Sequence, residues 1–234
     1  MADIPGFTGL SPQAGAFLAE LGSNNNRDWY VAHRTEFDRL VAGPLAALAE
    51  SIAPDMMCID PALICRVSRP NRDVRFSKDR SPYRTTMWFA YRPPQSEWTD
   101  LPAYFFEATP DHCRWGMGYF EASPATMAAL RDHVGEHQPT FLSAMDAATS
   151  RHFTLEGDPY KRLPTIPPDT PQPVADLVRR RNAYLCRVMR YGPALERATF
   201  SRELAIDFEA LARMYGLFLE ARSRWEPRGR RSAL

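Results

Sequence analysis

The amino-acid sequence predicts an α+β fold, with an antiparallel sheet over about residues 63–119 and helices before and after that segment. Large apolar residues alternate along 85–91, as they do in a strand that is buried on at least one face. A turn sequence at 109–112 separates two further apolar segments and indicates a hairpin. Serine followed by proline, at 11–12 and again at 123–124, is typical of a helix N-terminus.

The N-terminal part predicts two helices ahead of the sheet. The first runs from Ser11 to Gly22, and the second begins at Asn26, which caps it. Trp29 follows the helical spacing of apolar residues and is expected in the core. Gly43 and the proline after it interrupt this second helix, because proline lacks the N–H that an inner helical turn requires.

The sheet and the C-terminal helices follow from similar patterns. The predicted strands are 63–67, 85–91, 103–109 and 113–119, with one short addition at 153–155. The predicted later helices are 124–135, 139–148, 174–188 and 202–222. The last of these has apolar residues at three- and four-residue spacing, which is the pattern of an amphipathic helix.

Length and composition indicate an ordinary globular protein. The chain has 234 residues, 44% of them hydrophobic and 24% charged, which suits a single α+β domain over 1–222 and an Arg-rich, disordered tail over 223–234. No apolar run approaches the length of a membrane span, and the first residues do not resemble a signal peptide. The four cysteines are scattered, so we expect buried free thiols and a cytoplasmic location.

Positive charge is concentrated in residues 66–86, which we call the cationic segment. It contains six Arg and one Lys against two Asp, a net charge of +5 in a chain whose total is only +1. Such a patch usually has an anionic counterpart, which is a ligand, a nucleic acid or the protein's own carboxylates, unless the side chains extend into water. Two interpretations stay open. Either the arginines bind an external anion, or they form an internal network of ion pairs with Asp73 and Asp79.

The cationic segment also resembles a known family. The string from Asn71 to Arg84, NRDVRFSKDRSPYR, resembles the central motif of the DUF2461 (TIGR02453) family. The string from Asn24 to Tyr30, NNNRDWY, and the string from Asp158 to Pro164, DPYKRLP, are similar to two further motifs of that family. The resemblance extends over nearly the whole chain and implies a shared fold. It implies no reaction, because the family has no established function.

The first functional hypothesis is a small-molecule binder, or an enzyme of unknown reaction, with a cationic pocket beside the sheet. Its ligand carries a carboxylate or a phosphate, which suits the planar fork of arginine donors. Asp73 would orient an arginine or act as an acid or base, and Tyr83 would donate a proton or a hydrogen bond. The predicted ligand-binding residues are Arg72, Arg75, Ser77, Lys78, Arg84 and Trp115. Trp115 is expected to line an opening, because glycine follows it.

The second hypothesis is a nucleic-acid-binding protein. The cationic segment, the arginine run at 179–181 and the Arg-rich tail would together contact phosphates. The sequence pI of about 7.7 weighs against it, because dedicated nucleic-acid domains are more basic. No oligomeric state is predicted.

Motifs for cofactors and metals are largely missing. Gly116 and Gly118 lack the third glycine of a dinucleotide loop, and they indicate a bulge or a close approach of two backbones. His133 and His137 are one helical turn apart, but with no third ligand recognised close by the sequence predicts no metal site. No cofactor is predicted.

Overall fold

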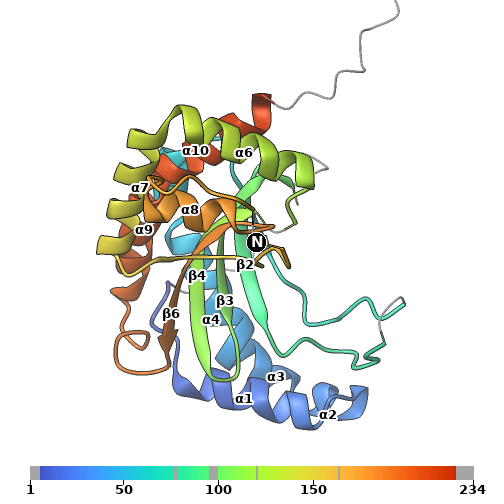
Figure 1. The fold of residues 1–234 in the computed structure, drawn as a ribbon. Coiled ribbons are helices and arrows are strands. Elements are labelled where there is room, and N and C mark those ends of the chain that lie inside the picture. The colour runs from blue at the N-terminus through green and yellow to red at the C-terminus, as the bar shows by residue number, and fades with distance from the viewer. Residues whose placement is uncertain (1–5, 76–77, 95–99, 120, 163, 225–234) are drawn as a thin grey trace, which may run out of the picture. The chain divides into compact units, whose positions relative to one another are not determined.

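The computed structural model of the protein describes residues 6–75, 78–94, 100–119, 121–162 and 164–224 and confirms the α+β class (Figure 1). Its sheet is antiparallel and has the strand order β1-β2-β3-β4-β6-β5. The strands are β1 (Ile64–Val67), β2 (Met87–Arg92), β3 (Pro102–Ala108), β4 (His112–Tyr119), β5 (Thr154–Glu156) and β6 (Tyr184–Arg190). The predicted region 63–119 thus forms the first four strands, and the sheet continues beyond it.

The N-terminal helices begin where the sequence predicts. Pro12 is the first residue of α1, and the Asn26 side chain caps α2 by accepting a hydrogen bond from the Trp29 backbone N–H at 3.0 Å. The predicted interruption at Gly43 is a widening of the helix, since the Gly43 N–H donates to the Asp38 carbonyl five residues earlier. The elements are α1 (Pro12–Ser23), α2 (Arg27–Ala32), α3 (Arg34–Phe37), the π-helix η1 (Asp38–Ala42), α4 (Gly43–Ser51) and α5 (Ala53–Ile59).

The structure corrects the helix predicted over 174–188. This region contains a short helix, α8 (Gln172–Val178), followed by β6, the strand that lies between β4 and β5 in the sheet. Leu185 and Cys186 are buried in β6. The apolar residues of a short strand and of a buried helical turn look alike by spacing alone, and here tertiary pairing decides the outcome.

Two glycines of β4 explain how β6 fits against it. A Cβ atom at Gly116 would lie 1.8 Å from the Leu185 carbonyl oxygen, and one at Gly118 would lie 2.3 Å from the Tyr184 Cα. Only glycine permits so close an approach of two backbones. The close approach predicted at these glycines is therefore confirmed.

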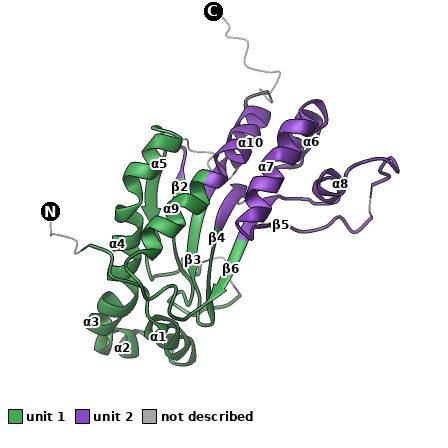
Figure 2. Ribbon diagram, turned by 90° about the vertical axis from the view of Figure 1, so that its left-hand side faces the viewer, with its two compact units in different colours: residues 1–91, 105–115, 187–209 green, residues 92–104, 116–186, 210–234 purple. Residues whose placement is uncertain are grey.

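The chain divides into two compact units, coloured separately in Figure 2. Unit 1 comprises residues 1–91, 105–115 and 187–209, and unit 2 comprises 92–104, 116–186 and 210–234. Strands β2, β3, β4 and β6 each contribute residues to both units. The single domain over 1–222 stays a prediction, and the tail from 225 onward lies outside the described residues.

Unit 1 has an aromatic core that supports the N-terminal helices and part of the sheet. Phe106 stacks near Trp115 with ring centroids 6.0 Å apart, and Phe200 meets Trp115 edge-on at 5.4 Å. Phe200 begins α9 (Phe200–Ala210), which covers the first part of the predicted helix 202–222. Trp29, predicted in the core, is only half-buried and stacks on His33, while its neighbour Tyr30 is buried.

Unit 2 is largely helical. It contains α6 (Pro124–Glu136), α7 (Gln138–Ser150), α8 and α10 (Ala212–Arg224), and α6 packs against α10. Ser123 caps α6 by accepting from the Thr126 backbone N–H at 3.1 Å, as its Ser-Pro sequence predicts. The helix predicted over 202–222 is thus two helices, interrupted at Leu211.

All four cysteines are free, as predicted, but their burial is mixed. Cys113 and Cys186 are buried, whereas Cys58 and Cys65 are exposed, so the expectation of buried thiols holds for half of them. Among the described residues, no helix combines the length and the apolar character needed to cross a membrane.

Candidate functional site

The cationic segment forms a loop between β1 and β2 that is closed by backbone pairing. Asn71 and Tyr83 form an isolated antiparallel bridge. The Arg72 N–H donates to the Pro82 carbonyl and the Arg84 N–H donates to the Pro70 carbonyl, each at 2.8 Å. These bonds hold the two ends of the loop together. The backbone that carries the loop side chains therefore has a defined position.

The Asn25 side chain holds this loop against the N-terminal helices. Its amide N–H donates to the Tyr83 carbonyl at 2.9 Å, and its carbonyl oxygen accepts from the Tyr83 N–H at 3.0 Å. The amide therefore pairs with Tyr83 as a neighbouring strand would. The two consecutive asparagines have separate functions, because Asn26 caps α2 and Asn25 binds the loop.

Arg72, Asp79 and Ser81 form a small polar network inside the loop. Arg72 forms an ion pair with Asp79, and the Ser81 backbone N–H donates to the other Asp79 oxygen at 2.9 Å. The hydrogen bonds from Ser81 and then from Arg72 hold the pKa of Asp79 well below its ordinary value. Asp79 is therefore ionised at neutral pH and acts as an acceptor only.

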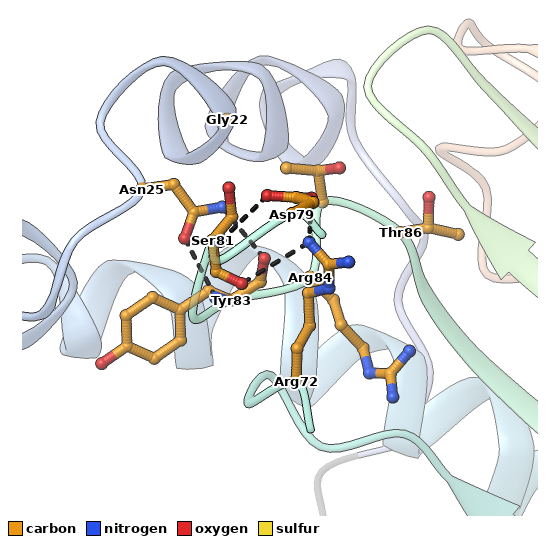
Figure 3. Close-up of a pocket in the computed structure, with 9 residues that line it drawn as sticks. Gly22, Asn25, Arg72, Asp79, Ser81, Tyr83, Arg84 and Thr86 are labelled. Carbon is orange, nitrogen blue, oxygen red and sulfur yellow. Dashed lines mark hydrogen bonds and ion pairs between the residues drawn. The ribbon is translucent and has the colours of Figure 1, made fainter. Parts of the chain in front are cut away.

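Beside this network lies an open pocket of about 410 Å³, shown in Figure 3. Figure 3 shows the Arg72 guanidinium between Asp79 and Ser81, while the Arg84 side chain extends away from Asp79. We call this site the arginine pocket. It is lined by Gly22, Asn25, Arg72, Asp79, Ser81, Tyr83, Arg84, Thr85 and Thr86.

Arg75 and Asp73, both predicted in the site, lie outside the lining of the arginine pocket. The Arg75 guanidinium binds the Asp73 carboxylate, with Nη2 and Oδ2 2.6 Å apart, and these hydrogen bonds lower the pKa of Asp73. Both side chains are more than half exposed. Lys78 is exposed as well and does not line the pocket, and Ser77 lies outside the described residues.

The side chains of Tyr83 and Trp115, the two aromatic residues predicted in the site, do not point toward the arginines of the pocket. Tyr83 contributes to the pocket wall, but its buried ring stacks on Tyr30 with centroids 4.1 Å apart and points away from both arginines (Figure 3). Trp115 does not line an opening, because its side chain is fully buried and donates to Asp207 at 2.8 Å. The glycine after it admits the β6 backbone and leaves no space for a ligand.

Several residues of the pocket lining were not among the predicted site residues, and two of them lie outside the cationic segment. Gly22 and Asn25 come from the end of α1 and the turn after it, and Thr85 and Thr86 directly precede β2. A Cβ atom at Gly22 would lie 3.3 Å from the Thr85 methyl group, so a larger residue would narrow the pocket. The one available signal was the Asn-Asn pair before Trp29, whose first member proves to bind the loop.

The arrangement suits binding of an anion more than acid–base chemistry. Among the described residues, the lining offers two guanidinium groups and the hydroxyl groups of Ser81, Thr85 and Thr86 as donors, and its carboxylate, that of Asp79, is already ion-paired. Among the described residues, no side-chain hydrogen bond or ion pair engages the Arg84 guanidinium. Arg84 is thus the cation of the lining best placed to meet an external negative charge.

The fold and this site define an α+β protein with an arginine-lined polar pocket between its N-terminal helices and a sheet-edge loop. A family model described as "Conserved hypothetical protein (DUF2461)" matches residues 13–216, and the chain belongs to this family. The match includes every residue that lines the arginine pocket. None of the curated proteins compared with the chain matches it.

Proposed function

We propose that this protein binds a small anionic molecule, bearing a carboxylate or a phosphate, in the arginine pocket. The observation that carries the proposal is the pairing of the lining charges. Asp79 neutralises Arg72, whereas Arg84 has no carboxylate partner among the described residues. One net positive charge therefore remains beside the hydroxyl groups of Ser81, Thr85 and Thr86. A carboxylate or phosphate accepts hydrogen bonds from both kinds of donor.

The rigidity of the pocket supports this function. Arg72 is held by Asp79, and the loop backbone is held by Asn25 and by the Asn71–Tyr83 bridge. Because the loop backbone that carries Arg84 is already ordered, less conformational entropy is lost than if the whole loop had to order on binding. The same bonds occupy Arg72 and Asn25, so Arg84 and the hydroxyl groups supply the direct contacts in our proposal.

The arrangement supports binding and not a particular reaction. Asp73 and Tyr83 stay predictions as catalytic residues, but Asp73 is paired with Arg75 at the surface and the Tyr83 ring points away from the arginines. A general acid or base must reach the reacting atom at hydrogen-bond distance. A cytoplasmic location also stays a prediction, in keeping with the four free cysteines.

The experiment compares two arginines of the same loop. Inorganic phosphate and acetate are titrated into the wild type and into Arg84→Gln and Arg75→Gln variants, with amide chemical shifts as the readout. We expect saturable shifts at Thr85 and Thr86 in the wild type and in Arg75→Gln, and at least a 10-fold weaker response in Arg84→Gln. Native mass spectrometry of the freshly purified protein then identifies a retained ligand. Equal binding by the two variants, or no saturable shift with either anion, would overturn the proposal.

The same variants distinguish a nucleic-acid function. Phosphate contacts spread over the exposed cations of the loop would depend on Arg75 as much as on Arg84 and would weaken steeply with salt. The arginine run at 179–181 supports that alternative poorly. Arg180 donates to the backbone carbonyls of Leu155 and Gly157, and Arg179 binds Asp176. Salt-dependent binding of an RNA or DNA pool, reduced in both variants, would favour the nucleic-acid hypothesis over ours.

A further inference from the structure

A cluster of metal-ligating side chains lies at the end of α6, in unit 2 and outside the arginine pocket. One ligand atom each from His133, Glu136 and His137 lies within 4.8 Å of the other two. The three positions follow helical spacing, with His133 as residue i, Glu136 as i+3 and His137 as i+4, so they share one face of the helix. Sequence reasoning recognised the two histidines and overlooked the glutamate between them.

A second carboxylate approaches the cluster from α10. The Glu220 Oε2 atom lies 3.3 Å from the His133 Nε2 atom, and α6 and α10 pack against each other within unit 2 (Figure 2). Two ligands of a tetrahedral zinc ion, each bonded at its usual length, lie about 3.4 Å apart. The His133–Glu220 separation therefore fits two ligands of one metal ion as well as it fits a hydrogen bond.

The His137 ring is held in the form that binds a metal. Its Nδ1 atom lies 2.9 Å from the His133 carbonyl oxygen. A carbonyl only accepts, so Nδ1 carries the proton, and in the neutral ring Nε2 keeps its lone pair. Metal-binding histidines commonly have this arrangement, with the second ring nitrogen donating to a carbonyl or carboxylate. The His133 and His137 rings lie next to each other, with centroids 4.3 Å apart.

The cluster combines one buried histidine with exposed carboxylates at the protein surface. The His133 side chain is 1% exposed, whereas the Glu220 side chain is 66% exposed and Glu136 is also exposed. In the proposed site, a change of side-chain rotamer at the exposed Glu136 and Glu220 brings their carboxylates to the metal and closes the remaining separation between ligand atoms. The spacing His-x-x-Glu-His itself occurs in one class of zinc enzymes, where both histidines bind the metal.

We propose that His133, Glu136 and His137, joined by Glu220 from α10, bind one divalent transition-metal ion, with Zn²⁺ as the reference ion. Imidazole and carboxylate ligands suit first-row ions of this kind. The ion would link the end of α6 to α10 and would keep its solvent-facing side accessible to water. This inference is independent of the anion proposed for the arginine pocket.

The test uses the full chain, stripped with a chelator and titrated with Zn²⁺ alone in a calorimeter. We expect one ion per chain and a higher Tm with Zn²⁺ than without it. His137→Ala and Glu136→Gln should each weaken binding by at least about 10-fold. Both positions are at least partly exposed, so these variants are expected to fold, which circular dichroism checks. Co²⁺ should report the ligands through its visible absorption, and His137→Ala should change that spectrum.

His152→Asn is the matched control, because it removes an exposed histidine outside the cluster and asparagine tolerates the positive φ at this position. It should bind Zn²⁺ like the wild type. Absence of stoichiometric binding would overturn the proposal and leave the His133–Glu220 contact as a simple polar pair. Binding that survives both His137→Ala and Glu136→Gln would also overturn it, since the ion would then be held elsewhere, for example by the exposed thiols of Cys58 and Cys65.

Discussion

Neighbouring residues of identical type have different physical functions in this protein, and Asn25 and Asn26 are the clearest example. Asn26 accepts the Trp29 N–H and satisfies a helix N-terminus, whereas Asn25 pairs with both backbone groups of Tyr83, 58 residues away. The first interaction stabilises a local element. The second shapes the arginine pocket. Alanine at each position should separate these functions.

We predict that Asn26→Ala lowers the free energy of unfolding by about 1 kcal/mol, the usual cost of a lost helix cap. Its affinity for phosphate should stay within about twofold of the wild type, because Asn26 does not line the pocket. Asn25→Ala should instead weaken phosphate binding by more than fivefold, because it releases the loop at Tyr83. Urea denaturation and phosphate titration of both variants check this. The same loss of affinity in both would contradict the division of functions.

At the residue scale, the buried carboxylate of Asp207 also has a structural function. Its Oδ2 atom accepts from the Trp115 indole N–H and from Arg187, each at 2.8 Å, and the side chain is 1% exposed. The Arg187 guanidinium also lies over the Trp115 ring, 5.2 Å from its centroid. Trp115, predicted to bind a ligand, thus belongs to a structural network that joins β4, β6 and α9.

We predict that Asp207→Ala lowers the free energy of unfolding by about 3–5 kcal/mol, because it leaves the largely buried Arg187 charge without this carboxylate. Glu209→Ala is the control, since Glu209 is exposed on the same helix and its loss should cost less than about 0.5 kcal/mol. Urea denaturation followed by circular dichroism measures both. Similar values for the two variants would refute the importance of the buried network.

At the scale of elements, β6 can pack closely against β4 because two residues of β4 are glycines and have no side chain. Gly116 and Gly118 leave room for the backbone at Tyr184 and Leu185, where any side chain would collide with main-chain atoms. Backbone atoms of a paired strand cannot move aside as the end of a flexible side chain can. The strand pairing is therefore sensitive to a single added methyl group.

Gly116→Ala should lower the free energy of unfolding by about 1–3 kcal/mol, as expected for overpacking in a tight interior. The Cβ would lie 1.8 Å from the Leu185 carbonyl oxygen, so β6 must shift. Gly135→Ala is the opposite case, because Gly135 is in α6 and its added Cβ would meet no atom within 4 Å other than its chain neighbours and the backbone of its own helix. It should raise the free energy of unfolding by about 0.5–1 kcal/mol. Thermal denaturation compares the stability of both variants with that of the wild type. A Gly116→Ala variant more stable than the wild type would contradict the predicted clash with the β6 backbone.

Local patterns account for most of the elements that the sequence predicted. Ser11 and Ser123 with their prolines mark the starts of α1 and α6, and the alternation before Tyr91 marks β2. The failures are tertiary in origin. Residues 184–188 pair with β4 because of glycines more than 60 residues away, which no local window includes. Likewise, nothing near Asn25 or Glu220 in the sequence indicates that they meet Tyr83 and His133.

At the scale of the whole molecule, the structure shows the ion pairs of the network interpretation, while the anion-binding interpretation stays a prediction. Asp73 and Asp79 each bind one arginine, as the network interpretation requires. Arg84 nevertheless faces a pocket without a carboxylate partner among the described residues, as the binding interpretation requires. Composition fixes only the number of charges. Which charges pair depends on the loop backbone, and that depends on the contact with Asn25.

Buried phenols are distributed over both units and make the whole fold sensitive to alkali. Tyr91 and Tyr191 in unit 1 and Tyr119 in unit 2 each donate their hydroxyl group to a backbone carbonyl, of Ala49, Thr109 and Phe218 respectively. Burial is the main cause that raises the pKa of all three phenols far above their ordinary value. Burial also raises the pKa of the Cys113 thiol to about 12.

We predict that stability is constant to about pH 8 and falls steeply above pH 10. A group with a raised pKa keeps its proton in the folded state while the unfolded chain loses it, so its contribution is complete below the unfolded pKa and is lost as pH rises. An unfolded tyrosine ionises near pH 10, and each retained proton changes the free energy of unfolding by about 1.4 kcal/mol per pH unit. Because unfolded tyrosine is only half ionised at pH 10, the three tyrosines together contribute an average slope of about −3 kcal/mol per pH unit between pH 10 and 11, and the Cys113 thiol adds about −1.3 kcal/mol per pH unit. Urea denaturation across this range measures the slope, and Tyr191→Phe should reduce its magnitude by about one quarter. A slope that is the same in the wild type and in Tyr191→Phe would show that the Tyr191 phenol ionises without unfolding the protein.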